Sequence, residues 1–150
     1  MMFNTIVVGT DGSKGALEAL AVAGELARTV GASDVHVVTA AAAYSRADIK
    51  HMESKLPAEF HDLISPHITA EDRFVQADDV LRPYGVRATR HEHDDGAADA
   101  ILDVANDVHA ELIVVGARGL SPVGRFFRGS VSTKVAHHSP CSVLIVEHAD

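Results

Sequence analysis

Short runs of apolar, mostly β-branched residues recur along this chain and alternate with segments of helical periodicity. These runs predict strands over residues 3–9 (FNTIVVG), 35–40 (VHVVTA), 112–116 (LIVVG) and 142–147 (SVLIVE). Their apolar residues are continuous rather than alternating, which is typical of strands that are covered on both faces of a parallel sheet. Residues 86–93 (VRATRHEH) alternate only loosely, so we expect them to form an edge strand.

Four segments between these runs carry apolar residues three and four positions apart, as a helix with one buried face requires. The first begins after Ser13, a good cap, and ends at about Val30, where Gly31 supplies a stop. The others run from Thr69 as a cap to residues 83–85, from Asp95 or Gly96 to Val108, and from Gly129 and Ser130 to about His138. Residues 41–68 show only weak periodicity, and we expect part of them to form a mobile flap.

The order of these elements is typical of an α/β fold with an open, five-stranded parallel sheet and helices on both faces, a doubly wound arrangement. The 150 residues, of which 47% are apolar and 23% charged, fit one globular domain that spans residues 1–150. Right-handed connections would place a ligand at the carboxyl ends of the strands, where the strand order reverses. The loops that follow the strands therefore form the candidate site.

Composition and charge indicate which binding partners the protein has and in which cell compartment it works. The chain has 13 Lys and Arg against 21 Asp and Glu, a net charge of −8, which disfavours binding to a nucleic-acid backbone. Its single cysteine, Cys141, can form no internal disulfide and belongs to no zinc-binding pattern. The first residues lack the pattern of a secretory signal, and no apolar run approaches the roughly 20 residues of a membrane span. We therefore expect a cytoplasmic protein without nucleic-acid or membrane partners.

The glycines after the strand at 112–116 form the strongest functional pattern, Gly116-x2-Gly119-x9-Gly129-Ser130. Glycines let the main chain approach a ligand closely. The start of a helix, here at Gly129 and Ser130, offers unpaired N–H groups and the positive end of the helix dipole to an anion. Arginines in the same segment raise the local positive charge: Arg118, Arg125 and Arg128. The pattern predicts a phosphate site.

Two well-known phosphate loops do not account for this pattern. The dinucleotide fingerprint requires G-x-G, which this chain lacks. Gly124 and Gly129 have the glycine spacing of a P-loop, but Ser130 stands where its lysine belongs, and no strand directly precedes Gly124. We therefore do not expect a P-loop NTPase.

The glycine spacing does resemble the ATP-binding motif of the universal stress protein family. The likeness extends over nearly the whole chain, from TIVVGTDGS at the front to LIVVGARG and GSVSTKVAHHSPCSVLIV at the back. It implies a fold of the adenine-nucleotide α-hydrolase-like type and the binding of an adenine nucleotide. ATP is the expected ligand, and Mg²⁺ would be carried by its phosphates.

The resemblance also implies roles for single residues near the base. Asp11 would lie beside the adenine, and Gly9 and Thr10 would give the main chain a close approach. Ala40, at the end of the second strand, would offer main-chain groups to the adenine edge. Thr39 departs from the family, in which histidine is frequent at this position, and we expect little effect on nucleotide binding.

The ribose and phosphate contacts are expected after the strand at 112–116. Val115 and Gly116 would lie near the ribose. The phosphate set consists of glycines, a hydroxyl and first-turn amides: Gly119, Gly129, Ser130, Val131 and Ser132. We add Arg118 to the predicted phosphate contacts because of its positive charge. The family resemblance does not imply this role, because the residue at this position varies in the family.

Simpler roles stand beside some of these assignments. Asp11 also suits a turn or a helix cap. His91 and His93 lie on one face of the predicted edge strand, but no third ligand is evident, so we expect no metal site. The sequence contains no nucleophile elbow, and the glycine loops contain no pair of carboxylates, which favours binding over efficient turnover.

We therefore predict a protein of the universal-stress type that responds to an adenine nucleotide by a change of conformation or partner. There are three alternatives. The protein could prefer cAMP, it could slowly hydrolyse ATP or phosphorylate itself on Ser130 or Ser132, or it could be a pure interaction module. The final strand, rich in β-branched residues from Val143 to Val146, can pair with the same strand of a second copy, as is common in the family. A homodimer is the expected assembly.

Overall fold

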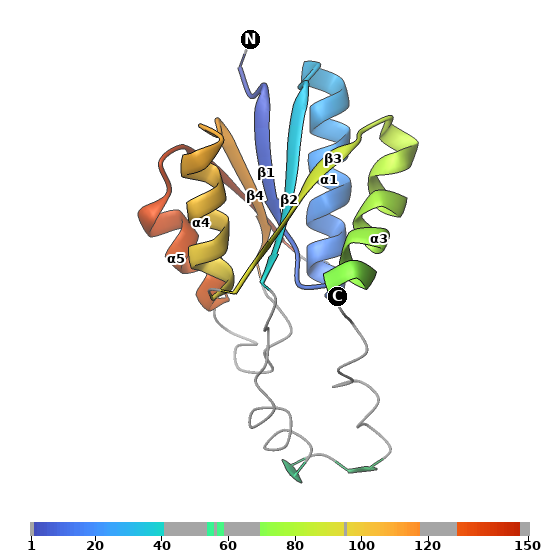
Figure 1. Cartoon of the computed structure of the whole chain (residues 1–150), viewed down its shortest axis with the longest axis vertical. Coiled ribbons are helices and arrows are strands. Elements are labelled where there is room, and N and C mark those ends of the chain that lie inside the picture. Colours follow the sequence, from blue (N-terminus) through green and yellow to red (C-terminus); the bar gives the residue numbers. More distant parts are fainter. Residues whose placement is uncertain are drawn as a thin grey trace.

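The computed structural model describes residues 2–40, 54–55, 57–58, 70–94, 96–117 and 129–147. Its sheet contains five parallel strands in the order β3-β2-β1-β4-β5. The strands are β1 (Thr5–Gly9), β2 (Asp34–Ala40), β3 (Ala88–His93), β4 (Leu112–Gly116) and β5 (Ser142–Val146). Their carboxyl ends share the lower edge of the sheet in Figure 1. The predicted five-stranded parallel sheet is confirmed.

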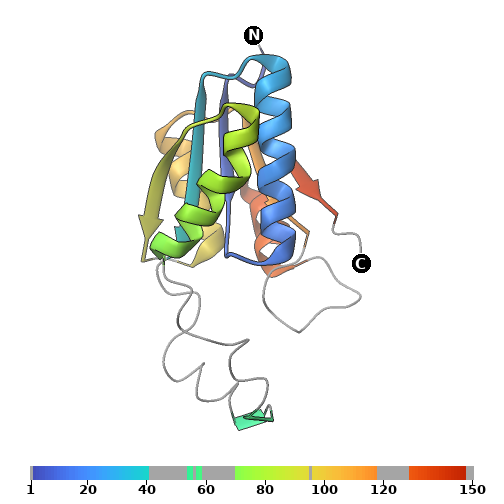
Figure 2. The ribbon, with the colours of Figure 1, turned by 90° about the vertical axis from the view of Figure 1, so that its right-hand side faces the viewer.

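Helices cover both faces of this sheet (Figure 1 and Figure 2). α1 (Lys14–Val30) and α3 (Ala70–Leu81) lie on one face, whereas α4 (Ala97–Asp107) and α5 (Ser130–His138) lie on the other. A short 3₁₀ helix, η2 (Arg82–Tyr84), follows α3. None of the described helices combines the length and the apolar character that a bilayer crossing needs. The doubly wound arrangement is thus present.

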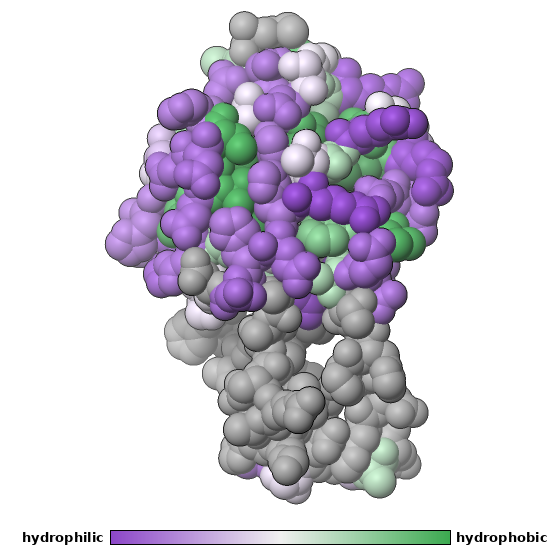
Figure 3. Space-filling model, viewed as in Figure 1, coloured by the Kyte–Doolittle hydropathy of each residue, from purple (hydrophilic) through white to green (hydrophobic). Residues whose placement is uncertain are grey.

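Two apolar cores hold these layers together. One lies between the sheet and the helices α1 and α3, and it includes Ile6, Leu20 and Leu81. The other lies between the sheet and the helices α4 and α5, and it includes Val7 and Ile101. Ile6 and Val7 are neighbours in β1 and belong to different cores, which explains why the central strand is apolar at successive positions. On the face of the molecule that Figure 3 shows, which is the face seen in Figure 1, apolar residues form only patches between hydrophilic ones.

The ends of α1 match the sequence signals. Ser13 is the N-cap, and its side chain accepts a hydrogen bond from the amide of Ala16 at 3.2 Å. Gly31 ends the helix in the left-handed conformation, with φ of 71°, and its N–H donates to the carbonyl of Ala27. Both predicted boundaries are confirmed.

The next two helices differ slightly from their predictions. The α-helical hydrogen bonding of α3 ends at Leu81, and residues 82–84 continue as η2, because Pro83 has no N–H to donate to an α-helical bond. Thr69, its predicted cap, lies outside the described residues. α4 begins after Gly96, one of its two predicted starts, and the other, Asp95, is not among the described residues.

β3 is an edge strand, as predicted, and it pairs with β2. A histidine pair that the sequence did not reveal joins the two strands: Nδ1 of His36 and Nε2 of His91 are 2.9 Å apart. Nε2 of His36 also lies 3.0 Å from Oδ1 of Asp34, but this contact does not have the geometry of a hydrogen bond. His36 is buried, whereas His91 is half-buried.

This pair predicts how stability depends on pH. Burial lowers the pKa of His91, and His36 and His93 lower it further, while Asp107 and Asp34 raise it. In the unfolded chain, His91 takes up a proton at about pH 6.5, whereas in the folded protein it stays neutral until a lower pH. The free energy of unfolding therefore decreases as the pH falls from about 6.5 toward the pKa of His91 in the folded protein. We expect this loss to be smaller in His91→Gln. Chemical denaturation of both proteins at about pH 7.5 and about pH 5.5 measures it, and equal losses would contradict the prediction.

Candidate functional site

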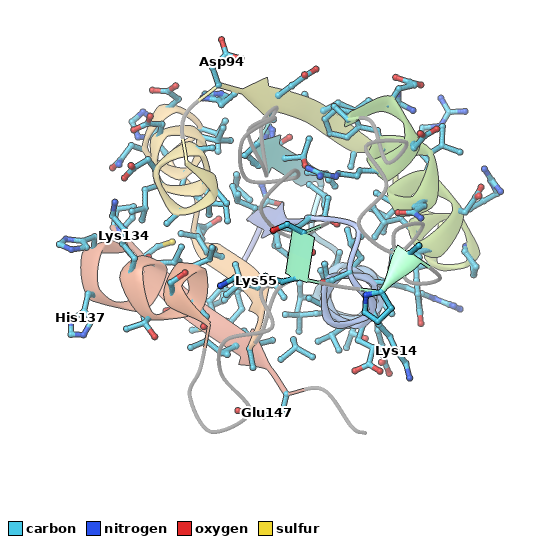
Figure 4. The ribbon with its side chains drawn as sticks, turned by 90° about the horizontal axis from the view of Figure 1, so that it is seen from below. Lys14, Lys55, Asp94, Lys134, His137 and Glu147 are labelled. Carbon is cyan, nitrogen blue, oxygen red and sulfur yellow. The ribbon has the colours of Figure 1, made fainter. Side chains whose placement is uncertain are left out.

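The candidate site lies at the carboxyl edge of the sheet, between β1 and β4. The chain continues from β1 through α1 to β2 on one side, and from β4 through α5 to β5 on the other, so the strand order reverses here. Figure 4 views this edge from below: Lys14, at the start of α1, and Lys134, on α5, lie on opposite sides of the strand ends. Asp94, after β3, and Glu147, after β5, mark the two edges of the sheet.

The turn from β1 to α1 is shaped by its own side chains. The amide of Thr10 donates to the carbonyl of Val38 at 2.9 Å, which continues the pairing of β1 with β2. Oγ1 of Thr10 accepts from the amide of Gly12 at 3.2 Å. Oδ1 of Asp11 accepts from the amide of Ser13 at 2.9 Å. Asp11 thus has the turn role that its residue type also suggested, and its contact with an adenine stays a prediction.

The glycines that end β1 and β4 are closely packed against other parts of the protein. A Cβ on Gly9 would lie 2.3 Å from Cδ1 of Ile101, which fills the space beside the strand end. A Cβ on Gly116 would lie 3.0 Å from the carbonyl oxygen of Gly15, in the first turn of α1. The sequence interpretation attributed both glycines to the close approach of a ligand. The packing of α4 and α1 explains them without one, and ligand contacts of their main chains stay predictions.

Hydrogen bonds around Ala117 fasten the start of α5 to the end of β4. The carbonyl of Ala117 accepts from the amide of Gly129 at 2.6 Å and from Oγ of Ser132 at 3.2 Å. Oγ of Ser132 is also 2.9 Å from the carbonyl of Gly129, and Ser132 is only 1% exposed. The Gly129 amide and the Ser132 hydroxyl therefore build the turn rather than face a ligand, and a contact of Gly129 with a phosphate stays a prediction.

The first turn of α5 leaves main-chain donors unpaired. Gly129 precedes the helix without a side-chain cap, and the amide of Thr133 donates to its carbonyl at 3.1 Å. The amides that precede Thr133 in the helix have no acceptor in the described part of the chain: Ser130, Val131 and Ser132. Together with the positive end of the helix dipole, these donors favour an anion.

A shallow hollow lies beside these donors, between the starts of α4 and α5. Its lining comes from the first turns of both helices and includes Gly96, Asp99, Ser130, Val131 and Lys134. Nζ of Lys134 is 2.9 Å from Oδ1 of Asp99, and both side chains are about half exposed. Gly96, like the glycine before α5, caps its helix without a side chain. The positive ends of two helix dipoles therefore meet at this hollow.

Several predicted site residues are not described by the structure. Arg118 and Gly119 lie outside the described residues, as do Arg125, Arg128 and nearly all of residues 41–68. Ala40 and Val115, at the ends of β2 and β4, are both buried. Their burial suits the main-chain contacts that were predicted for them, which stay predictions.

The sequence interpretation missed Arg73, a residue of α3 that is 6% exposed. Its Nη1 donates to Oγ1 of Thr39 at 2.9 Å and to the carbonyl of Ala40 at 3.1 Å. Oγ1 of Thr39 in turn donates to the carbonyl of Thr10 at 2.8 Å. The network connects α3 to the ends of β2 and β1. One signal was available, because Arg73 stands four positions before Ala77, on the buried face of the helix.

Comparison with known proteins identifies the family. A model of the universal stress protein family matches residues 2–147. This chain belongs to that family. A universal stress protein of Synechocystis is 36% identical over 88 residues, which are 59% of this chain and 55% of the relative. In the matches with curated relatives, this chain spans 31% to 55% of the relative's length.

Solved structures of universal stress proteins share the fold over almost the whole chain. A crystal structure of one in complex with cAMP is 29% identical, has a TM-score of 0.71, and covers 99% of this chain and 100% of its own. A universal stress protein of Archaeoglobus fulgidus in complex with dAMP is 27% identical, with a TM-score of 0.64 and coverage of 97% and 98%. These likenesses agree with the parallel sheet and its two layers of helices.

Proposed function

We propose that this universal stress protein binds an adenine nucleotide at the carboxyl edge of its sheet and acts as a regulatory module in the stress response. A phosphate binds the first turn of α5, where the amides of Ser130, Val131 and Ser132 are unpaired within the described chain. The base lies toward the ends of β1 and β2, near Asp11 and Ala40. The proposal rests on these unpaired donors at the point where the strand order reverses.

Two related structures support the choice of ligand. They hold cAMP and dAMP, which share an adenine and a single phosphate group. The N-terminus of one helix suits the phosphate, because its amides and dipole favour negative charge. Main-chain groups at the strand ends suit the polar edge of a base.

Among adenine nucleotides, we propose ATP as the first ligand and cAMP as the second. Residues 118–128 contain Arg118, Arg125 and Arg128, more positive charge than a single phosphate requires. Mg²⁺ would arrive with the triphosphate, held by its phosphates and by water. The cAMP complex favours the second ligand, because that protein covers 99% of this chain.

Slow ATP hydrolysis or autophosphorylation is an alternative activity, and burial separates its two candidate acceptors. Ser130 is exposed at the start of α5. The hydroxyl of Ser132 is buried and within hydrogen-bond distance of two main-chain carbonyls. If bound ATP transfers a phosphate to this protein, Ser130 is the better acceptor. We propose binding without efficient turnover as the principal function.

The variant Gly129→Asp tests the phosphate position. Gly129 has φ of −57° and ψ of 151°, a conformation that an aspartate N-cap adopts readily. The new carboxylate would accept from amides of the first turn of α5 and repel a phosphate, so we expect the affinity for ATP to fall at least about tenfold. The fold should be kept, because a capping aspartate stabilises a helix. Isothermal titration calorimetry measures the affinity, and thermal unfolding checks the fold.

Gly129→Ala is the matched control, because it adds a side chain that cannot cap the helix. Its affinity for ATP should fall clearly less than that of Gly129→Asp, because the methyl group carries no charge to repel a phosphate. Equal ATP affinities of the aspartate and alanine variants would contradict the phosphate position. The same titration run with cAMP as competitor ranks the two ligands, and tighter binding of cAMP would make it the first ligand.

We also propose a homodimer formed through β5. This strand is at the edge of the sheet and pairs with β4. Leu144 at its centre is 36% exposed, so a second copy would pair the open edge and cover this side chain. Light scattering should give twice the mass of one chain for the unmodified protein. For Leu144→Lys it should give the mass of one chain. A monomeric unmodified protein at micromolar concentration would contradict the dimer.

A further inference from the structure

Arg73 is a buried cation at the edge of the sheet that carries the proposed site. It comes from α3, whose other buried residues are Phe74, Ala77 and Leu81. No ion pair connects Arg73 to a carboxylate within the described chain, where its buried Nε also lacks a hydrogen-bond partner. Its Nη1 donates to neutral oxygens instead.

Packing alone does not account for an arginine at this position. Burial removes the hydration of the guanidinium, and hydrogen bonds to neutral oxygens replace it only in part. A methionine of similar length would fill the same space with a smaller free-energy penalty. The distinctive property of Arg73 is therefore where its hydrogen bonds end, on main-chain groups at the ligand edge.

The hydrogen bonds of Arg73 orient two carbonyls. Nη1 donates directly to the carbonyl of Ala40 at 3.1 Å, and to Oγ1 of Thr39 at 2.9 Å. Because the Thr39 hydroxyl accepts from Arg73, its own hydrogen is directed to the carbonyl of Thr10, at 2.8 Å. The hydrogen bonds that begin at Nη1 thus orient main-chain carbonyls at the ends of both β2 and β1. Thr39, which the sequence analysis expected to matter little, is the link between them.

We propose that Arg73 is a positioning residue that sets the base selectivity of the nucleotide site, an inference that rests on the function proposed above. The carbonyl of Ala40 keeps a second lone pair, which can accept from the 6-amino group of adenine and repels the 6-oxo group of guanine. Rotation of this peptide would present an N–H instead and reverse the preference. The hydrogen bond from Arg73 opposes that rotation, so the guanidinium selects adenine without touching it.

The test compares the affinities for ATP and GTP, measured by calorimetry, in the unmodified protein and two variants. Arg73→Met keeps the length of the side chain but removes its donors, and Thr39→Val removes the linking hydroxyl at nearly constant shape. We expect Arg73→Met to lower the ratio of ATP affinity to GTP affinity about tenfold, the value of one hydrogen bond to a charged group. Thr39→Val keeps the hydrogen bond from Arg73 to Ala40 but loses the hydroxyl that holds the guanidinium, so we expect a smaller loss of about threefold. The double variant should lose little more than Arg73→Met alone, because both residues act through one network.

Two further variants separate this role from a general effect of lost charge. Arg82→Met removes an exposed arginine of η2 and should leave the ratio unchanged. Arg73→Lys restores a donor at the same position and should recover part of the selectivity. Melting temperatures of all variants show whether they fold.

The outcomes distinguish a role of Arg73 in base selectivity from a purely structural role. A ratio within about twofold of the unmodified value in folded Arg73→Met would overturn the proposal. Equal losses of ATP and GTP affinity would overturn it too, because a purely structural role predicts them. If Arg73→Met does not fold, an unchanged ratio in folded Thr39→Val would overturn the proposal, because that variant loses the hydroxyl that holds the guanidinium beside Ala40. An unmodified protein that binds neither nucleotide contradicts the proposed function itself, and with it the role of Arg73.

Discussion

The candidate site depends on the reversal of strand order between β1 and β4. With parallel strands and right-handed connections, the chain leaves these two strands in opposite directions, and none of the described helices crosses the space between their carboxyl ends. The helices that follow them, α1 and α5, begin at this same edge. In the proposed site, the strand ends supply main-chain groups for a base, and the start of α5 supplies donors for a phosphate.

The starts of these two helices differ in their caps. Ser13 caps α1, and its side chain accepts from the amide of Ala16, so this donor of the first turn is already paired. Gly129 stands at the same position before α5 and has no side chain with which to do this. Within the described chain, the first-turn amides of α5 therefore have no acceptor, which suits the phosphate site that we propose. A glycine in place of a capping side chain thus distinguishes the start of α5, where we propose that a phosphate binds, from the start of α1.

The fold followed from the sequence because its signals are local. Continuous apolar runs, the Ser13 cap and the Gly31 stop each act within a few residues, and the structure confirms them. The glycines were harder to interpret. A ligand and a packed side chain both require a missing Cβ, and only the position of Ile101 shows which one surrounds Gly9. The sequence gives no such information about a distant neighbour.

The networks that the sequence did not reveal depend on long-range register. His36 meets His91 only because β2 and β3 pair in one particular alignment. Arg73 meets Thr39 only because α3 packs across the end of β2. Helical spacing marked position 73 as buried, but a buried position says nothing of the partner. Arg118 and Gly119, outside the described residues, remain predictions from the family resemblance.

The most direct test of the account observes the amides themselves. In a two-dimensional ¹H–¹⁵N NMR titration, the amide signals of Ser130, Val131 and Ser132 should shift strongly when ATP or cAMP is added. Adenosine, which has the base but no phosphate, should leave these three signals nearly unmoved while it shifts signals at the ends of β1 and β2. Shifts of the α5 amides that are absent, or equal with adenosine, would contradict a phosphate bound at the first turn of α5.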